Sequence, residues 1–99
     1  MSKYITVFLN LSVESKELAK VTDDLVKLPE VVDAYEVTGE YDVVAILQVE
    51  DIQSFRELLK DKILKIEGVK STVSSVVLYA YKHQGTDSAQ KLSFTNVPV

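Results

Sequence analysis

The segment Val37–Asp42, together with the apolar run that follows it, constrains the fold of this chain more than any other feature. Gly39 lies in the middle of the segment, and glycine adopts positive φ without steric cost. The run Val43–Leu47 is typical of a buried strand. We therefore expect a tight turn that joins two strands, Val31–Thr38 and Tyr41–Glu50, into a hairpin.

Two further strands and two helices are predicted from the spacing of apolar residues. Lys3–Asn10 alternates as a strand that is apolar on both faces, and β-branched residues dominate Val69–Tyr81. Helical spacing predicts one helix that is capped by Ser12 and ends before Pro29, and another that is capped by Asp51. The predicted order is strand, helix, strand, strand, helix, strand.

This order predicts a ferredoxin-like α+β fold, βαββαβ, with an antiparallel four-stranded sheet and both helices on one face. The other face has no helix over it, although Val44 and Ile46 make that side of the third strand apolar. We expect a second copy of the same sheet to cover it in a homodimer. Residues 1–82 form this domain, and for the tail at 83–99 a short edge strand or disorder remain alternatives.

Composition limits the functions that this chain can have. Its 99 residues, 46% of them hydrophobic, suit one domain, and the net charge of −4 disfavours direct nucleic-acid binding. The absence of cysteine excludes disulfides and thiolate sites, and a single histidine cannot make a multi-histidine metal site. Without a signal peptide or a run of membrane-spanning length, we expect a cytoplasmic protein that contacts no membrane and carries no metal or cofactor.

The residues from Leu28 to Asp42, followed by an apolar strand, a helix and the segment Glu67–Ser74, resemble the effector-binding domain of the Lrp/AsnC family. That domain is called RAM, for regulation of amino acid metabolism. The resemblance covers roughly residues 3–81, and its most specific part is the Gly-x-Tyr-Asp turn. Members usually carry an amino-terminal helix-turn-helix; because the first strand begins close to Met1, we expect a stand-alone form that lacks it.

The resemblance implies six ligand-binding residues, four in the turn and two on the last strand: Gly39, Glu40, Tyr41, Asp42, Thr72 and Ser74. Backbone amides of the turn could hold a carboxylate, whereas the Asp42 carboxylate and the hydroxyls could accept from an ammonium group. Asp42 at a strand start is equally typical of a capping carboxylate, and Tyr41 of an interface residue. Ser74 replaces the threonine that is more usual in the family, which leaves the effector's identity open.

The resemblance also implies an assembly. RAM domains pair through their sheets, four dimers often close into an octameric ring, and effectors, typically amino acids, bind between dimers. The expected function is therefore a non-enzymatic module that senses a small effector at a subunit interface. Such a module could modulate full-length Lrp/AsnC-type transcriptional regulators by mixed assembly.

Two other functions remain open at this point. A small dimeric α+β barrel enzyme, of the cofactor-independent monooxygenase or isomerase type, has the same strand order but needs a polar pocket between sheet and helices. The sequence places aliphatic residues there and offers no catalytic candidate, since His83 is expected to be exposed or at an edge. An ACT-like amino acid sensor differs in how its strands pair between subunits.

Overall fold

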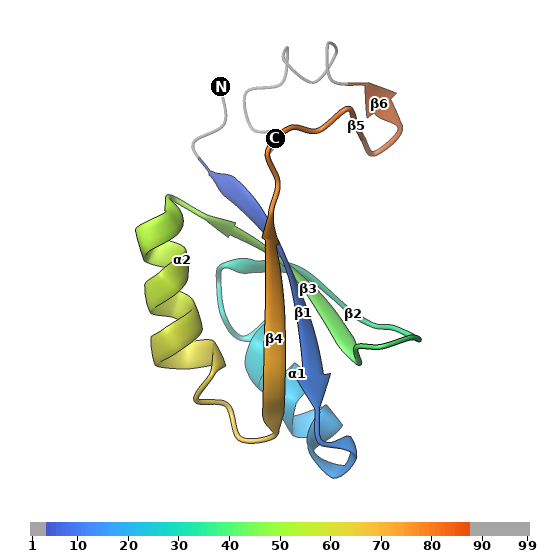
Figure 1. The fold of residues 1–99 in the computed structure, drawn as a ribbon, viewed down its shortest axis with the longest axis vertical. Coiled ribbons are helices and arrows are strands. Elements are labelled where there is room, and N and C mark those ends of the chain that lie inside the picture. Colours follow the sequence, from blue (N-terminus) through green and yellow to red (C-terminus); the bar gives the residue numbers. More distant parts are fainter. Residues whose placement is uncertain (1–3, 88–99) are drawn as a thin grey trace.

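The computed structural model describes residues 4–87, in which helices cover one face of a four-stranded sheet (Figure 1). The elements are, in chain order, β1 (Ile5–Val13), the 3-10 turn η1 (Ser15–Glu17), α1 (Leu18–Val26), β2 (Val31–Glu36), β3 (Val43–Val49), α2 (Ile52–Leu58), the π-helical turn η2 (Leu59–Ile63), β4 (Val69–Val76), β5 (Lys82–His83) and β6 (Thr86–Asp87). The order from β1 to β4 confirms the predicted α+β arrangement.

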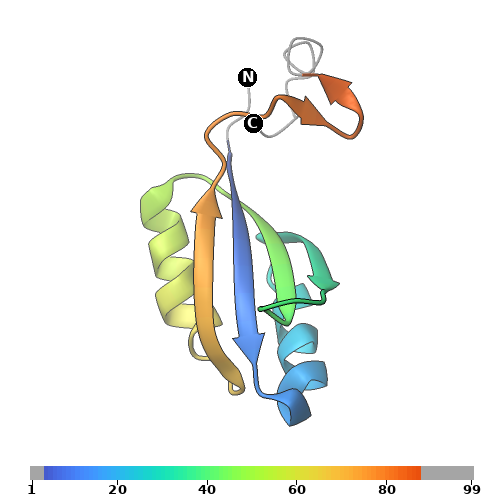
Figure 2. The same ribbon diagram turned by 45° about the vertical axis from the view of Figure 1, so that its right-hand side comes forward.

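The sheet has the strand order β2-β3-β1-β4, and every neighbouring pair is antiparallel. Leu9 of the central strand β1 pairs with Ala45 of β3 on one side and with Ser74 of β4 on the other. Figure 2 shows the four strands side by side. This is the ferredoxin-like order that the sequence predicts, with β2 and β4 as the edges.

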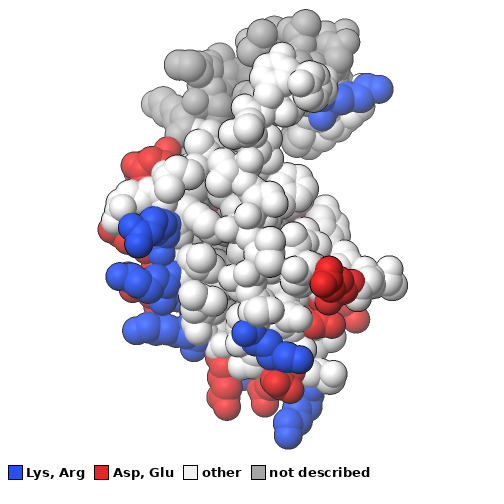
Figure 3. All heavy atoms as spheres, viewed as in Figure 1, with Lys and Arg blue, Asp and Glu red and all other residues white. Residues whose placement is uncertain are grey.

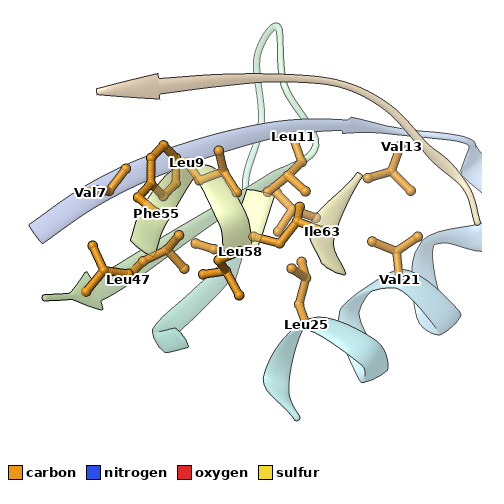
Figure 4. Close-up of a cluster of buried hydrophobic side chains, with 13 residues drawn as sticks. Val7, Leu9, Leu11, Val13, Val21, Leu25, Leu47, Phe55, Leu58 and Ile63 are labelled. Carbon is orange, nitrogen blue, oxygen red and sulfur yellow. The ribbon is translucent and has the colours of Figure 1, made fainter. Parts of the chain in front are cut away.

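The hydrophobic core lies between the sheet and the helices. Every second residue of β1 and of β3 is buried, which is the two-residue period of a strand with one face in the core. The helices and η2 supply the opposing layer (Figure 4). The buried hydrophobic residues are Val7, Leu9, Leu11, Val13, Val21, Leu25, Val43, Ala45, Leu47, Val49, Phe55, Leu58 and Ile63.

On the other face of the sheet, called here the uncovered face, residues 4–87 place no helix. One row of paired residues crosses it from β2 to β4 and consists of Tyr35, Val44, Asn10 and Val73. Tyr35 is 54% exposed and Val73 46%, and Phe8 in the neighbouring row is 41% exposed. The prediction of an apolar face without a helix is therefore confirmed.

The first helix begins later than predicted, and the prediction of Ser12 as its N-cap is wrong. β1 continues to Val13, and Ser12 pairs with Ser71 of β4. Leu11 and Val13 are buried, so extending the sheet through them outweighs the local capping signal of Ser12. Asp51, by contrast, is the N-cap of α2 as predicted: it accepts a hydrogen bond from the Ser54 amide at 2.7 Å, which lowers the pKa of Asp51.

The last strand of the sheet is shorter than predicted. β4 stops at Val76, whereas the sequence suggested a strand as far as Tyr81. The next residues leave the sheet, and Lys82–His83 then pairs with Thr86–Asp87 across a turn at Gln84 and Gly85, both with positive φ. The edge strand or disorder expected for Lys91–Val99 lies outside the described residues. Within the described part of the chain, no helix is long and apolar enough to cross a membrane.

Gly68, which precedes β4, packs closely against η1 and α1, and a substitution there tests this packing. Its φ is 106°, and an added Cβ would lie 2.5 Å from the Glu17 Cβ and 2.9 Å from the Val21 Cγ2. Because backbone strain and overpacking act together, Gly68→Ala is expected to lower the free energy of unfolding by roughly 2–5 kcal/mol. Urea unfolding followed by circular dichroism measures the change.

Gly39→Ala is the matched control. Gly39 has a similar φ of 111°, but among the described residues an added Cβ there meets no atom within 4 Å. Only the conformational cost remains, about 1–2 kcal/mol. Equal destabilisation by the two variants would contradict the close packing of Gly68 against α1 and η1.

Candidate functional site

The turn between β2 and β3 projects from the sheet (Figure 1), and its shape depends on one glycine and one hydrogen bond. Gly39 adopts a φ of 111°, and the Val37 amide donates to the Asp42 carbonyl oxygen at 3.0 Å. Because an added Cβ at Gly39 would meet no described atom within 4 Å, the backbone conformation and not close packing requires glycine. The turn is thus a preformed and accessible backbone loop.

Asp42 fixes this turn to the central strand. Its amide donates to the Leu11 carbonyl oxygen at 2.9 Å, and its Oδ2 accepts from the Val13 amide at 2.8 Å. These bonds hold the turn against the end of β1. Oδ1 accepts no hydrogen bond from residues 4–87, so one carboxylate oxygen of the half-buried Asp42 remains for a ligand.

Glu40 and Tyr41 complete the turn with different exposure. Glu40 is exposed, and Tyr41 is half-buried. A carboxylate in solvent next to a partly covered phenol ring gives this end of the sheet both a charged and an aromatic surface. The four turn residues predicted from the sequence, Gly39, Glu40, Tyr41 and Asp42, therefore lie together at the surface.

Thr72 and Ser74 lie on the edge strand β4, on the other side of β1 from the turn. Thr72 pairs with Leu11, and Leu11 in turn pairs with Val43 at the start of β3. Two strand spacings, roughly 10 Å, thus separate Thr72 from the β3 row. Within one chain the structure does not bring these two residues into contact with the turn. Their position on an edge strand leaves them accessible to another chain.

The interior between the sheet and the helices contains no polar pair among the described residues. Among the described residues, Thr6 is the polar residue that is buried as a whole, and it pairs with Gln48 on the uncovered face. The buried Oε1 of Glu30 belongs to a residue just before β2 that lines a surface hollow with Ser54 and Glu57 of α2. Residues 4–87 also contain no group of three His, Cys, Asp or Glu side chains that could hold a metal ion, and His83 is half-buried on β5. The hydrophobic core between the sheet and the helices, as far as residues 4–87 describe it, is lined by aliphatic residues and one phenylalanine.

Three surface hollows of the described residues lie away from the turn. They have volumes of about 180, 300 and 330 Å³ and are lined by residues of α2 and η2 and by the ends of β2 and β3. None of these three includes a turn residue, Thr72 or Ser74.

The bond between Asp42 and Val13 was not predicted from the sequence, because it joins residues 29 positions apart. Asp42→Ala leaves the Val13 amide without its partner, so we expect the free energy of unfolding to fall by about 1–3 kcal/mol. Urea unfolding measures this loss, and amide exchange at Val13 should accelerate. Asp42→Asn keeps an acceptor and should lose less, whereas Glu40→Ala should change little. Unaltered exchange at Val13 in Asp42→Ala would contradict the anchoring role.

Comparison with known proteins identifies the chain with one family. The model of the Lrp/AsnC ligand binding domain matches residues 6–87. The transcriptional regulator FL11 of Pyrococcus furiosus is 35% identical over 78 residues, which are 79% of this chain and 51% of FL11. The regulator Ptr1 of Methanocaldococcus jannaschii is 31% identical over 78 residues, 79% of this chain and 53% of Ptr1. The chain thus spans about half the length of the curated relatives it matches.

Solved structures agree with this result. TTHA0845 from Thermus thermophilus superimposes with a TM-score of 0.75 and 29% identity, covering 80% of this chain and 99% of that one. AsnC of Escherichia coli gives a TM-score of 0.79 with 25% identity over 84% of this chain and 56% of its own. The regulator NMB0573 of Neisseria meningitidis, solved as an L-Met complex, gives 0.78 with 26% identity over 89% of this chain and 58% of its own.

Proposed function

This chain belongs to the Lrp/AsnC ligand-binding domain family, and from that premise we propose that it is a regulatory module that binds a small effector, an amino acid, between subunits. The observation that carries the proposal is the preformed turn Gly39–Asp42 within the family match. The turn presents backbone amides and one carboxylate oxygen without a hydrogen bond from the described residues. Such groups suit the two charged ends of an amino acid.

The L-Met complex of the Neisseria meningitidis regulator supports an amino acid as the effector class. In this chain the α-carboxylate of the effector would accept hydrogen bonds from the turn amides near Gly39 and Tyr41. The ammonium group would donate to the Oδ1 of Asp42. Because β1 separates the turn from Thr72 and Ser74 in one chain, these two residues would join the site from the β4 edge of a neighbouring chain.

The uncovered face supports a homodimer formed by sheet packing. Phe8, Tyr35 and Val73 expose between 41% and 54% of their surface on that face, and water contact with such a contiguous apolar patch is unfavourable. Figure 3 shows charged side chains gathered at the flanks, with a largely uncharged band along the middle of the molecule. We propose that such dimers assemble further, as an octamer, to create the seams where the turn binds its effector.

The proposal includes an effect on transcription. The curated relatives are named as transcriptional regulators and are about twice as long as the match. Matching sheet surfaces would let this chain assemble with full-length Lrp/AsnC-type regulators. The module would then change their activity through the composition of the assembly and its effector, and not by contacting DNA.

Isothermal titration of the standard amino acids into the wild-type chain tests the effector site. We expect at least one amino acid to bind, and Asp42→Asn to weaken that binding about tenfold or more. The amide oxygen of asparagine would accept from Val13, so an NH2 group, which cannot accept from the ammonium group, would replace the free carboxylate oxygen. Asp61→Asn, an exposed carboxylate on η2, is the control and should bind normally. Absence of binding by every amino acid, or equal affinity of the Asp42→Asn variant, would refute the site.

Sedimentation velocity at micromolar concentration tests the dimer. Phe8→Asp places a charge on the uncovered face and is expected to shift the chain from dimer to monomer, because a buried unpaired carboxylate is costly. Leu64→Asp is the control, since Leu64 is similarly exposed, at 49%, but lies after η2. A wild-type chain that sediments as a monomer, or a Phe8→Asp variant that stays dimeric, would rule out packing through this face.

A further inference from the structure

The segment after β4, residues 77–87, is called here the arm. It leaves the sheet after one last ladder bond, in which the Val77 amide donates to the Thr6 carbonyl oxygen at 2.9 Å. Beyond that bond Leu78 is 92% exposed and Tyr81 is 82% exposed. Large apolar side chains with so little cover on their own chain indicate a surface that packs against something else.

Contacts within the arm itself give it a defined conformation. The ring of Tyr79 meets that of Tyr81 edge to face, with centroids 5.1 Å apart. The β5–β6 hairpin closes the arm through the pairing of His83 with Thr86. In Figures 1 and 2 the arm rises beyond the end of the sheet and turns to the side away from α2. It therefore presents Tyr81 and Lys82 in a defined position outside the domain.

A hollow lies at the same end of the sheet and is called here the end hollow. Its volume is about 300 Å³, and its walls include apolar Pro29 and Val49 and the carboxylates of Glu30 and Glu50. Gln48 also lines it and pairs with Thr6, the residue to which the arm is attached. The arm and the end hollow therefore belong to one end of the molecule.

The wall of the end hollow carries two carboxylate side chains, Glu30 and Glu50. The Oε1 of Glu30 is fully buried and has no hydrogen bond within the described residues. Two carboxylates at the wall of one hollow favour a cation between them. Lys82 on the arm is an exposed cation next to the exposed ring of Tyr81. Charge and apolar character thus match between the two surfaces.

The arm of the same chain does not fill the hollow. Ser54 of α2 forms part of the hollow wall, and the arm turns to the side away from α2. A second copy of the chain carries an identical arm, and two-fold symmetry would let each copy present its arm to the other. In such a dimer, the arm of each copy would contact the end hollow of the other copy.

We propose that, in the dimer, the arm of each copy packs Tyr81 against the end hollow of the other copy and places the Lys82 ammonium beside Glu30 and Glu50. The arm exchange rests on the proposed function only in requiring a dimer. It assigns a role to the exposed arm and a cationic partner to the carboxylates that line the end hollow. It also fixes the orientation of the dimer, because the arm ends of both sheets must lie together.

Disulfide trapping tests the contact, because the chain has no cysteine of its own. The double variant Lys82→Cys/Glu50→Cys, incubated with a mild oxidant, is expected to give a covalent dimer on a non-reducing gel. The control Lys82→Cys/Glu57→Cys places the second thiol on the exposed side of α2, outside the end hollow, and should run as a single chain on the same gel. A covalent dimer from the control as well, a disulfide within one chain, or no disulfide in either variant would overturn the proposal.

A charge exchange tests the pairing by an independent route. Lys82→Glu is expected to weaken dimerisation about tenfold at low salt, and adding Glu50→Lys should restore it, because the two opposite charges then face each other again. Lys65→Glu makes the same charge change on an exposed residue elsewhere and should have little effect. Lack of restoration by the double exchange would refute the pairing.

The sedimentation experiment separates this inference from the proposed function. If wild-type chain is a monomer, the sheet dimer itself fails. If it is a dimer that Phe8→Asp dissociates, but neither trapping nor charge exchange succeeds, only the arm exchange fails.

Discussion

β1 hydrogen-bonds to β3 along one edge and to β4 along the other, so the two halves of the chain are joined through this strand. Its inward side chains, Val7, Leu9, Leu11 and Val13, are buried under the helices. Any change that moved β1 by one residue would turn these side chains onto the uncovered face. The register of β1 therefore decides where the core, the uncovered face and the turn lie.

The same strand organises the candidate site. Asp42 contacts the end of β1 through the Leu11 carbonyl and the Val13 amide, which gives the turn a fixed place at one end of the sheet. On the far side of β1, Thr72 occupies the β4 edge. An effector that touched both would have to lie between subunits, so the central strand links effector binding to assembly in the proposed function.

The two ends of the sheet have different surfaces. One end carries the turn with its backbone amides and the Asp42 carboxylate. The other carries the exposed arm and the end hollow with Glu30. In the proposed assembly, the first end would contact neighbouring dimers and the effector, while the second would hold the two chains of one dimer together. The uncovered face between the two ends would be shared by both chains of that dimer.

Local patterns in the sequence determined most of the fold. The continuous apolar run Val43–Leu47 and the Asp51 cap were sufficient to predict β3 and α2, because local hydrophobicity and capping act over a few residues. The failure of the Ser12 cap and of the strand end at Tyr81 has the opposite cause: burial of Leu11 and Val13, and loss of a pairing partner after Val77, depend on residues far apart in the chain. The turn was predictable as a motif, but its anchoring to Val13, its separation from Thr72 and the hollow beside Glu30 were decided only by the tertiary structure, since strand pairing sets these distances.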